Sequence, residues 1–263
     1  MNAIKWIYPL GLRQRLAYRF VVRSRKWPSN PDEPHKLALA PASLTKLSRT
    51  DVAHRNIAWL GFYELTLSRQ IAKLARRPGG LLVDVGANAG YYSCMWASLL
   101  PGNRCLAFEA SPRNFAMLRE NIVSAGLESQ IDLFGVALGK TQGRMDFDPG
   151  SIEQTGWGGL SIVHTEDCLA VEVKRLDQVV PPDSQIEVLK IDTEGADAWV
   201  LEGAKALLHD KRIHHVFFEC NFPRMKQLGI EPESPVSFLR NCGYHVRELA
   251  GGHSNKEFYA CTD

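Results

Sequence analysis

Residues 81–90, Leu-Leu-Val-Asp-Val-Gly-Ala-Asn-Ala-Gly, constrain the fold of this chain more than any other segment. They predict a buried strand over residues 81–85 that runs straight into a glycine turn. A second signal is Glu109, which ends the next apolar run. In a βαβ unit this spacing brings the carboxylate beside the glycine loop, where it can accept hydrogen bonds from a ribose. The two signals predict a nucleoside-containing cofactor at the carboxyl ends of parallel strands.

The glycine loop departs from two common nucleotide-binding motifs. It lacks the G-x-G-x-x-G pattern of dinucleotide sites, and no Gly-Lys-Ser/Thr follows it as in a P-loop. The turn has one glycine fewer and presents Asp84 and Asn88 as polar groups. This combination suits a ligand with an amino acid and a nucleoside but no pyrophosphate, such as S-adenosylmethionine. A turn without any ligand is the simpler alternative, and Glu109 favours the cofactor.

The size and composition of the chain are those of an ordinary globular protein. Its 263 residues suffice for one large α/β domain with an appendage, and 45% of them are hydrophobic and 23% charged. The formal net charge of +2 is too small to indicate a nucleic-acid partner. None of the six cysteines forms a C-x-x-C pair or a zinc-finger spacing, so we expect reduced thiols in a cytoplasmic protein. They are Cys94, Cys105, Cys168, Cys220, Cys242 and Cys261.

The first part of the chain is basic. Seven lysines and arginines precede the first acidic residue, Asp32. The segment is either an interfacial helix for a peripheral contact with anionic lipid, or a solvated extension, which we favour. Its apolar run, residues 3–12, is too short to span a membrane and lacks the features of a secretion signal. Proline-rich residues 28–50 predict a linker or wrapping segment, so we divide the chain into residues 1–55 and 56–263.

Strands and helices alternate in the larger part. Apolar periodicity predicts one helix over residues 57–74, and later runs predict the strands and helices of a parallel sheet covered on both faces. The expected core strands are residues 81–85, 105–109, 131–136, 186–191 and 213–218, with helices between them, among them one from about Pro112 and one from Val200 to Leu208.

Two regions depart from this alternation. Between residues 139 and 182 the short strands 144–147 and 170–174 enclose a glycine-rich loop and predict a β insertion. We weigh equally whether Trp157 in that loop forms part of an acceptor pocket or packs the loop onto the sheet. The last two strands, residues 244–248 and 257–261, flank a glycine turn and should pair antiparallel.

Carboxylates stand at four of the predicted strand ends, where open parallel sheets bind their ligands. They are Asp84, Glu109, Asp192 and Glu219. Each carboxylate could instead cap the helix that follows it. For Asp192, capping and ligand binding are both open. For Glu109 we favour ligand binding, because glutamate is a poor helix cap. Glu194 either contacts a substrate hydroxyl or complements the dipole of the following helix.

Five further motifs stand in order along the chain: VDVGANAGYYS, FEASP, LREN, VALG and LKIDTEGADAWVLEGA. Together they resemble the FkbM family of S-adenosylmethionine-dependent methyltransferases, and the resemblance covers roughly residues 80–250. It implies a class I methyltransferase fold, which is Rossmann-like and doubly wound, with seven mainly parallel strands and an antiparallel last strand. To this fold we add an N-terminal helical extension, and residues 56–263 become the methyltransferase domain.

The resemblance also implies roles for individual residues. Those at the methionine end of the cofactor are Asp84, Gly86, Asn88 and Gly90. Glu109 takes the ribose hydroxyls, and Val136 and Ala137 flank the adenine. Asp192 and Glu194 match the acidic motif that faces the transferred methyl group. One departure is Ala110, since proline often follows the ribose carboxylate in this family.

The implied reaction is O-methylation of a hydroxyl on a small molecule, sugar or other natural product. A hydroxyl is a weak nucleophile, so a general base is useful, and Asp192 and Glu194 are the first candidates before any histidine. A magnesium site at Asp192, Glu219 and Asn221 is conceivable, but we expect no metal because no clustered pattern supports it. Two alternatives are a nicotinamide-dependent oxidoreductase and a non-catalytic module that binds the cofactor or docks on a membrane.

Overall fold

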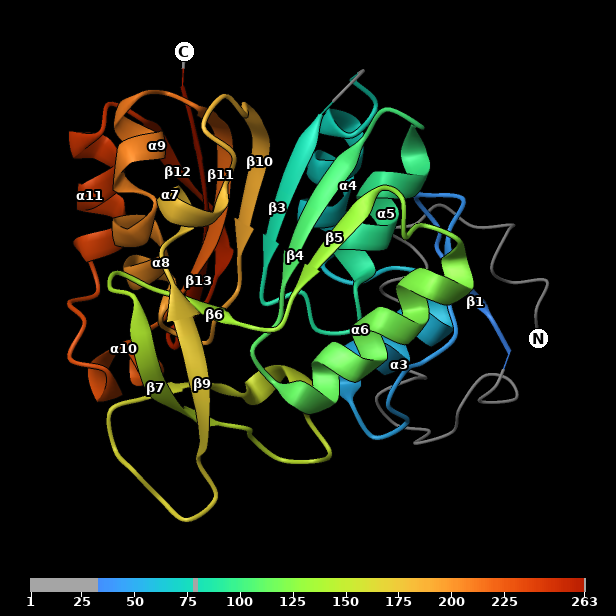
Figure 1. Cartoon of the computed structure of the whole chain (residues 1–263), viewed down its shortest axis with the longest axis horizontal. Helices are drawn as coiled ribbons and strands as arrows, with labels where there is room; N and C mark the ends of the chain where they lie inside the picture. The colour runs from blue at the N-terminus through green and yellow to red at the C-terminus, as the bar shows by residue number, and fades with distance from the viewer. Residues whose placement is uncertain (1–32, 78–79, 263) are drawn as a thin grey trace.

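The computed structural model describes residues 33–77 and 80–262. A seven-stranded sheet of order β12-β13-β11-β10-β3-β4-β5 stands between two layers of helices (Figure 1). Its parallel strands are β3 (Leu81–Val85), β4 (Arg104–Phe108), β5 (Ile131–Phe134), β10 (Ile186–Ile191) and β11 (Ile213–Asn221). β13 (Asn255–Cys261) runs antiparallel between β11 and β12 (His245–Gly251). The predicted seven-stranded, mainly parallel sheet with an antiparallel last strand is confirmed.

Helices cover both faces because side chains alternate along each strand. Leu82 faces one apolar cluster and Val83 faces the other. The first cluster includes residues of α3 (Val52–Leu60), α4 (Leu65–Leu74), α5 (Tyr91–Leu99) and α6 (Pro112–Ala125). The second includes residues of α7 (Leu176–Val179), α8 (Asp197–Gly203), α9 (Lys205–His209), α10 (Phe222–Gln227) and α11 (Ser234–Asn241).

The prediction of a single helix over residues 57–74 is wrong, because α3 and α4 are separate helices. Gly61 ends α3 with a φ of 77°, and a Cβ there would lie 2.8 Å from the backbone oxygen of Lys36. Glu64 before α4 also has a positive φ, 42°. Both helices pack on one core, so their apolar residues keep a common periodicity across the break. The helix predicted through Val200 and Leu208 is likewise divided, into α8 and α9.

The β insertion is confirmed, with corrections. β5 ends at Phe134 rather than at residue 136, and β6 (Ala137–Leu138) already belongs to a second sheet of order β6-β9-β7-β8. The other strands are β7 (Gly143–Asp148), β8 (Gly159–Ser161) and β9 (Leu169–Lys174). β8 and the short 3-10 helix η1 (Thr155–Trp157) were not predicted. The second sheet lies at the carboxyl end of the large sheet (Figure 1).

The described residues before α3 pack on the domain. β1 (His35–Lys36) and β2 (Ser43–Leu44) pair antiparallel, and Leu37 and Leu44 are buried in the same cluster as α5. The predicted boundary at residue 55 lies inside α3, and the division of the chain into two parts stays a prediction. The basic segment and the N-terminal helical extension fall within residues 1–32, outside the described residues.

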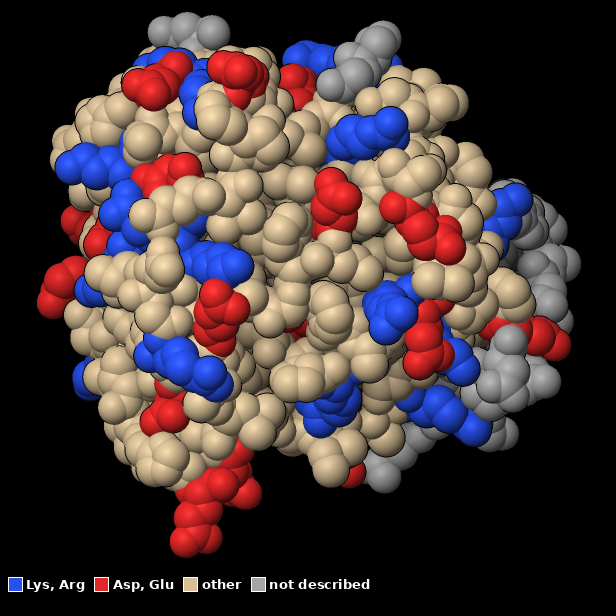
Figure 2. All heavy atoms as spheres, viewed as in Figure 1, with Lys and Arg blue, Asp and Glu red and all other residues tan. Residues whose placement is uncertain are grey.

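The surface in Figure 2 shows acidic and basic side chains interspersed over the face of the molecule seen in Figure 1. This distribution agrees with the small formal net charge of +2. In the part of the chain that the structure describes, no helix has both the length and the apolar character needed to cross a membrane.

Candidate active site at the carboxyl ends of the strands

A cavity lies where β3, β4 and β10 end. The loop after β3 contributes Gly86 and Asn88, and the residue after β4 contributes Glu109. Val136 and Ala137 form another part of the wall, and residues 158–160 of the insertion also line the cavity. Six of the nine predicted site residues therefore line one cavity: Gly86, Asn88, Glu109, Val136, Ala137 and Asp192.

Gly86 joins two walls of the cavity. Its φ is 74°, and a Cβ at this position would lie 1.9 Å from the carbonyl oxygen of Asp192. The glycine is therefore required by the approach of the loop to the end of β10, a reason that a single sequence segment does not reveal. Gly90 caps α5 and lies against Leu118, and it does not line the cavity.

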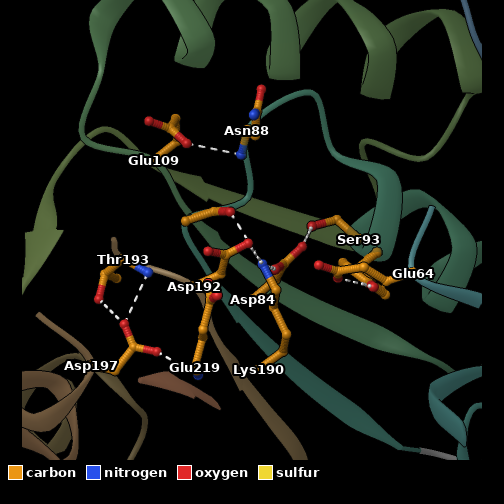
Figure 3. Close-up of polar contacts among 12 residues, drawn as sticks. Glu64, Asp84, Asn88, Ser93, Glu109, Lys190, Asp192, Thr193, Asp197 and Glu219 are labelled. Carbon is orange, nitrogen blue, oxygen red and sulfur yellow. Dashed lines mark hydrogen bonds and ion pairs between the residues drawn. The ribbon is translucent and has the colours of Figure 1, made fainter. Parts of the chain in front are cut away.

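Glu109 is held firmly on the cavity wall. It is 6% exposed, and its Oε2 accepts a hydrogen bond from the backbone N–H of Asn88 at 2.8 Å (Figure 3). Its Oε1 accepts one from the backbone N–H of Ser111 at 2.9 Å. Burial raises the pKa of Glu109 to about 7, although both hydrogen bonds oppose this. Each carboxylate oxygen can still accept a further hydrogen bond, because it has a second lone pair.

Asp84 and Lys190 lie beneath the cavity. Asp84 is fully buried; its Oδ2 accepts a hydrogen bond from the Ser93 hydroxyl (2.6 Å), and its Oδ1 lies 3.6 Å from the Lys190 ammonium. That ammonium also donates to the Gly86 carbonyl (3.3 Å) and to Asp192 Oδ2 (3.4 Å) (Figure 3). Burial lowers the pKa of Lys190, but the carboxylates of Asp192, Asp84 and Glu64 together raise it above its ordinary value.

The sequence analysis assigned no role to Lys190. A signal was present, since Lys190 is a charged residue inside a predicted buried strand. In the sheet it stands directly opposite Asp84 on β3. Charged groups are rarely buried without a partner, so a buried carboxylate beside Lys190 was to be expected from the sequence.

The two candidate bases occupy different places. Asp192 lines the cavity with its side chain 32% exposed. Glu194 does not line it, and its Oε2 accepts a hydrogen bond from Asn221 Nδ2 at 2.9 Å. Burial, and then Asp192, raise the pKa of Glu194 to about 7. The geometry therefore favours Asp192, and both catalytic assignments stay predictions.

Asn221, one of the three conceivable magnesium ligands, has other hydrogen-bond partners in the structure. Asn221 donates its side-chain amide to Glu194, and its Oδ1 caps α10 by accepting from the backbone of Arg224. Over residues 33–77 and 80–262, no three histidine, cysteine, aspartate or glutamate side chains are arranged to hold a metal ion.

A loop of the insertion lines the cavity and is bound to two distant segments of the chain. The Thr155 backbone N–H and hydroxyl donate to Asp51 Oδ2 at 2.7 and 3.0 Å, and Asn114 Nδ2 donates to the Thr155 carbonyl at 2.8 Å. Trp157 in the same loop is 63% exposed, so it does not pack the loop onto the sheet, and it does not line the cavity. Sequence reasoning missed Asp51, Asn114 and Thr155, because residues far apart in the chain carry no local pattern.

His54 supports the glycine loop. Its Nδ1 accepts a hydrogen bond from the Ser48 backbone N–H (2.9 Å), so the proton is on Nε2, which donates to Asn88 Oδ1 (3.2 Å). Burial lowers the pKa of His54, which keeps the ring neutral. We infer that this histidine positions Asn88.

The fold and the site together define the class of protein. A doubly wound sheet of this strand order, with a glycine loop after one core strand and a buried carboxylate after the next, is a class I methyltransferase fold. A crystal structure of an FkbM methyltransferase from Methylobacillus flagellatus KT shares the fold, with a TM-score of 0.50 and 16% sequence identity. The match covers 69% of this chain and 43% of that chain.

Sequence comparisons identify the family. The methyltransferase FkbM domain matches residues 84–246. The 2-O-methyltransferase NoeI of Sinorhizobium fredii is 30% identical over 165 residues, which cover 56% of this chain and 67% of that protein. The 31-O-demethyl-FK506 methyltransferase FkbM of Streptomyces tacrolimicus is 27% identical over 206 residues, 65% and 74% of the two chains. The chain belongs to the FkbM methyltransferase family, which confirms the resemblance and the prediction of a methyltransferase over an oxidoreductase.

Proposed function

We propose that the protein transfers a methyl group from S-adenosylmethionine to a hydroxyl of a small molecule or glycan. The observation that carries this proposal is the buried Glu109 carboxylate beside the Gly86 loop in one cavity. The names of both relatives support it, since one is a 2-O-methyltransferase and the other methylates 31-O-demethyl-FK506.

The residues of the cavity fit the cofactor by their chemistry. Glu109 has free acceptor capacity for two ribose hydroxyls, and the buried Val136 and Ala137 offer an apolar wall for adenine. Gly86 and Asn88 would hold the methionine end of S-adenosylmethionine. Asp84 and Gly90, which do not line the cavity, would support the loop after β3. When bound, S-adenosylmethionine supplies a methyl group on a sulfonium sulfur, which leaves as a thioether once an acceptor oxygen takes the methyl.

The chain supplies positioning and a base. We infer that a carboxylate oxygen of Asp192 accepts the proton of the acceptor hydroxyl, with Glu194 as second candidate. Lys190 fixes Asp192 from below, and the loop around Thr155 keeps water out of the cavity. Because the reaction is an in-line displacement, alignment of the reacting atoms and exclusion of water account for much of the rate.

Substitution Glu109→Ala tests the cofactor assignment. We expect S-adenosylhomocysteine to bind the unaltered protein saturably in calorimetry and to bind the variant about 100-fold more weakly, since hydrogen bonds to a charged group contribute about 1.5–3 kcal/mol each. Glu120→Ala, on the exposed face of α6, should leave the affinity unchanged. If the unaltered protein binds neither S-adenosylmethionine nor its demethylated product, the proposed function is wrong.

The pH dependence of binding provides a second test. Because burial raises the pKa of Glu109 to about 7, its ionised and better acceptor form increases as pH rises from 6 to 8. We expect the affinity for S-adenosylhomocysteine to rise several-fold over this interval and expect Glu109→Gln to flatten the curve. An equal pH dependence in the variant would show that another group is responsible.

Two further expectations concern the surroundings of the protein. All six cysteines are unpaired in the structure, which supports a reducing compartment and hence the cytoplasm. A peripheral membrane contact through the basic N-terminal segment stays a prediction. If the contact exists, the protein should co-sediment with anionic liposomes in a salt-sensitive manner, and deletion of residues 1–27 should abolish this binding.

A further inference from the structure

Large apolar side chains are exposed together on the β insertion. In the part of the chain that the structure describes, seven large hydrophobic side chains are exposed, and five of them lie between residues 152 and 169. We call these five side chains the insertion patch: Ile152, Trp157, Ile162, Val163 and Leu169. Ile152 is 80% exposed and Val163 is 64% exposed. Single exposed hydrophobic residues are ordinary, whereas a group of them marks a binding surface.

The insertion patch stands on the second sheet. Two of its side chains come from the loop between β7 and β8, and Leu169 begins β9. The other two follow β8, in the connection to β9 that projects from the molecule (Figure 1). Residues 158–160, between the two connections, line the cofactor cavity. A segment bound to the patch would therefore contact a stretch of chain that forms part of that cavity.

The surroundings of the insertion patch are acidic. Residues 149–169 contain Glu153, Glu166 and Asp167 but no lysine or arginine. All three carboxylates are exposed. None of them forms an ion pair with a residue in the ranges 33–77 and 80–262. A partner that suits this surface is therefore both apolar and positively charged.

We propose that the insertion patch binds the N-terminal segment of the same chain, residues 1–27. This segment lies outside the described residues. Its sequence contains seven lysines and arginines and no acidic residue. Between the basic residues stand large hydrophobic ones, among them Trp6, Leu16 and Phe20. The segment thus complements the insertion patch in charge, and its apolar side chains supply the surface that the patch would bury.

The chain is long enough for this contact. The first described residue is Glu33, and residues 1–32 span up to roughly 100 Å when extended. The described part of the chain that follows also adjoins the insertion. Thr155 in the loop between β7 and β8 donates two hydrogen bonds to Asp51, which caps α3.

Two other occupants of the insertion patch fit less well. A second copy of the chain, bound through the same patch, would bring Glu153, Glu166 and Asp167 toward their own copies, and like charges across an interface are unfavourable. An anionic membrane would be repelled by the same three carboxylates. The basic segment meets neither repulsion.

Carbodiimide crosslinking of the full chain tests the proposal, because this reagent joins an amine directly to a carboxylate in contact with it. The links are mapped by mass spectrometry in the monomeric fraction of a dilute solution. We expect the lysines of the segment to be linked to the carboxylates of the insertion: Lys5 and Lys26 to Glu153, Glu166 or Asp167. Glu128 and Glu202 are exposed outside the insertion and should form no such links. Added salt should lower the yield of the expected links.

The double variant Ile162→Ser with Val163→Ser tests the apolar part of the insertion patch. It keeps all three carboxylates, so a lower yield of links reports weaker binding of the segment and not the loss of a reacting group. We expect the yield to fall about 5-fold, because two aliphatic side chains that the segment would bury are removed. Val123→Ser is the matched control, since Val123 is 54% exposed on α6, outside the insertion, and its substitution should leave the yield unchanged. Both variants should keep the melting temperature of the unaltered protein, because the replaced side chains are exposed.

Several results would overturn the proposal. The lysines of the segment could form no link with the insertion, or link as often to Glu128 and Glu202, or keep the same yield in the double variant. Links found only in covalent dimers would assign the insertion patch to a second copy of the chain. Loss of liposome binding in the double variant would assign it to a membrane. None of these measurements uses S-adenosylhomocysteine, so the proposed function is tested separately.

Discussion

The variant Gly86→Ala is expected to lose at least about 4 kcal/mol of unfolding free energy, a value that single substitutions reach only through a few mechanisms, among them steric overpacking and backbone strain. A Cβ at this position would lie 1.9 Å from the Asp192 carbonyl oxygen, and a φ of 74° is unfavourable for alanine. Relief of the clash requires the loop after β3 to move away from the end of β10. The cofactor cavity lies between these two segments, so the affinity of the variant for S-adenosylhomocysteine should fall as well.

Gly126→Ala is the matched control for this prediction. Gly126 ends α6 with a similar φ of 66°, but no atom lies within 4 Å of the position of its Cβ. The control therefore has only the conformational cost, about 1 kcal/mol. Urea unfolding of both variants measures the difference. If Gly86→Ala is no less stable than Gly126→Ala, the close approach of the loop to Asp192 does not exist in solution.

The variant Lys190→Met should lower the unfolding free energy by about 3–5 kcal/mol, the usual result of removing one partner of a buried ion pair. It leaves the fully buried Asp84 without the ammonium 3.6 Å away, and Ser93 then remains as its hydrogen-bond donor. Asp192 also loses the hydrogen bond that its Oδ2 accepts from the Lys190 ammonium. Equilibrium denaturation measures the stability, and calorimetry with S-adenosylhomocysteine measures the site.

Two comparisons identify the cause of that loss. Lys174→Met removes an exposed ion pair with Glu172 and should cost less than about 1 kcal/mol. The double variant Asp84→Asn with Lys190→Met removes both buried charges and should be more stable than Lys190→Met alone. A double variant that is less stable than the single one would show that Lys190 matters through packing and not through its pairing with Asp84.

Local patterns in the sequence predicted the strands and most helices of the large sheet. The reason is that buried parallel strands are short apolar runs, and glycine and proline mark where they end. The sequence also predicted that the glycine loop after Asp84 and the Glu109 carboxylate belong to one cofactor site. This was possible because a βαβ unit sets their separation along the chain. Six of the nine predicted site residues line one cavity for the same reason: the carboxyl ends of adjacent parallel strands share one edge of the sheet.

Tertiary structure decided what depends on contacts between distant segments. The break between α3 and α4 follows from the approach of Gly61 to Lys36, and the need for Gly86 follows from the backbone of Asp192. The sequence placed Lys190 in a strand, but only the register of β10 beside β3 pairs it with Asp84. Glu219, Glu257 and Glu64 meet in the same way, because strand pairing brings Glu219 opposite Glu257 while the α3–α4 turn adds Glu64. Periodicity records the neighbours of a residue along the chain, whereas these partners are set by how the elements pack.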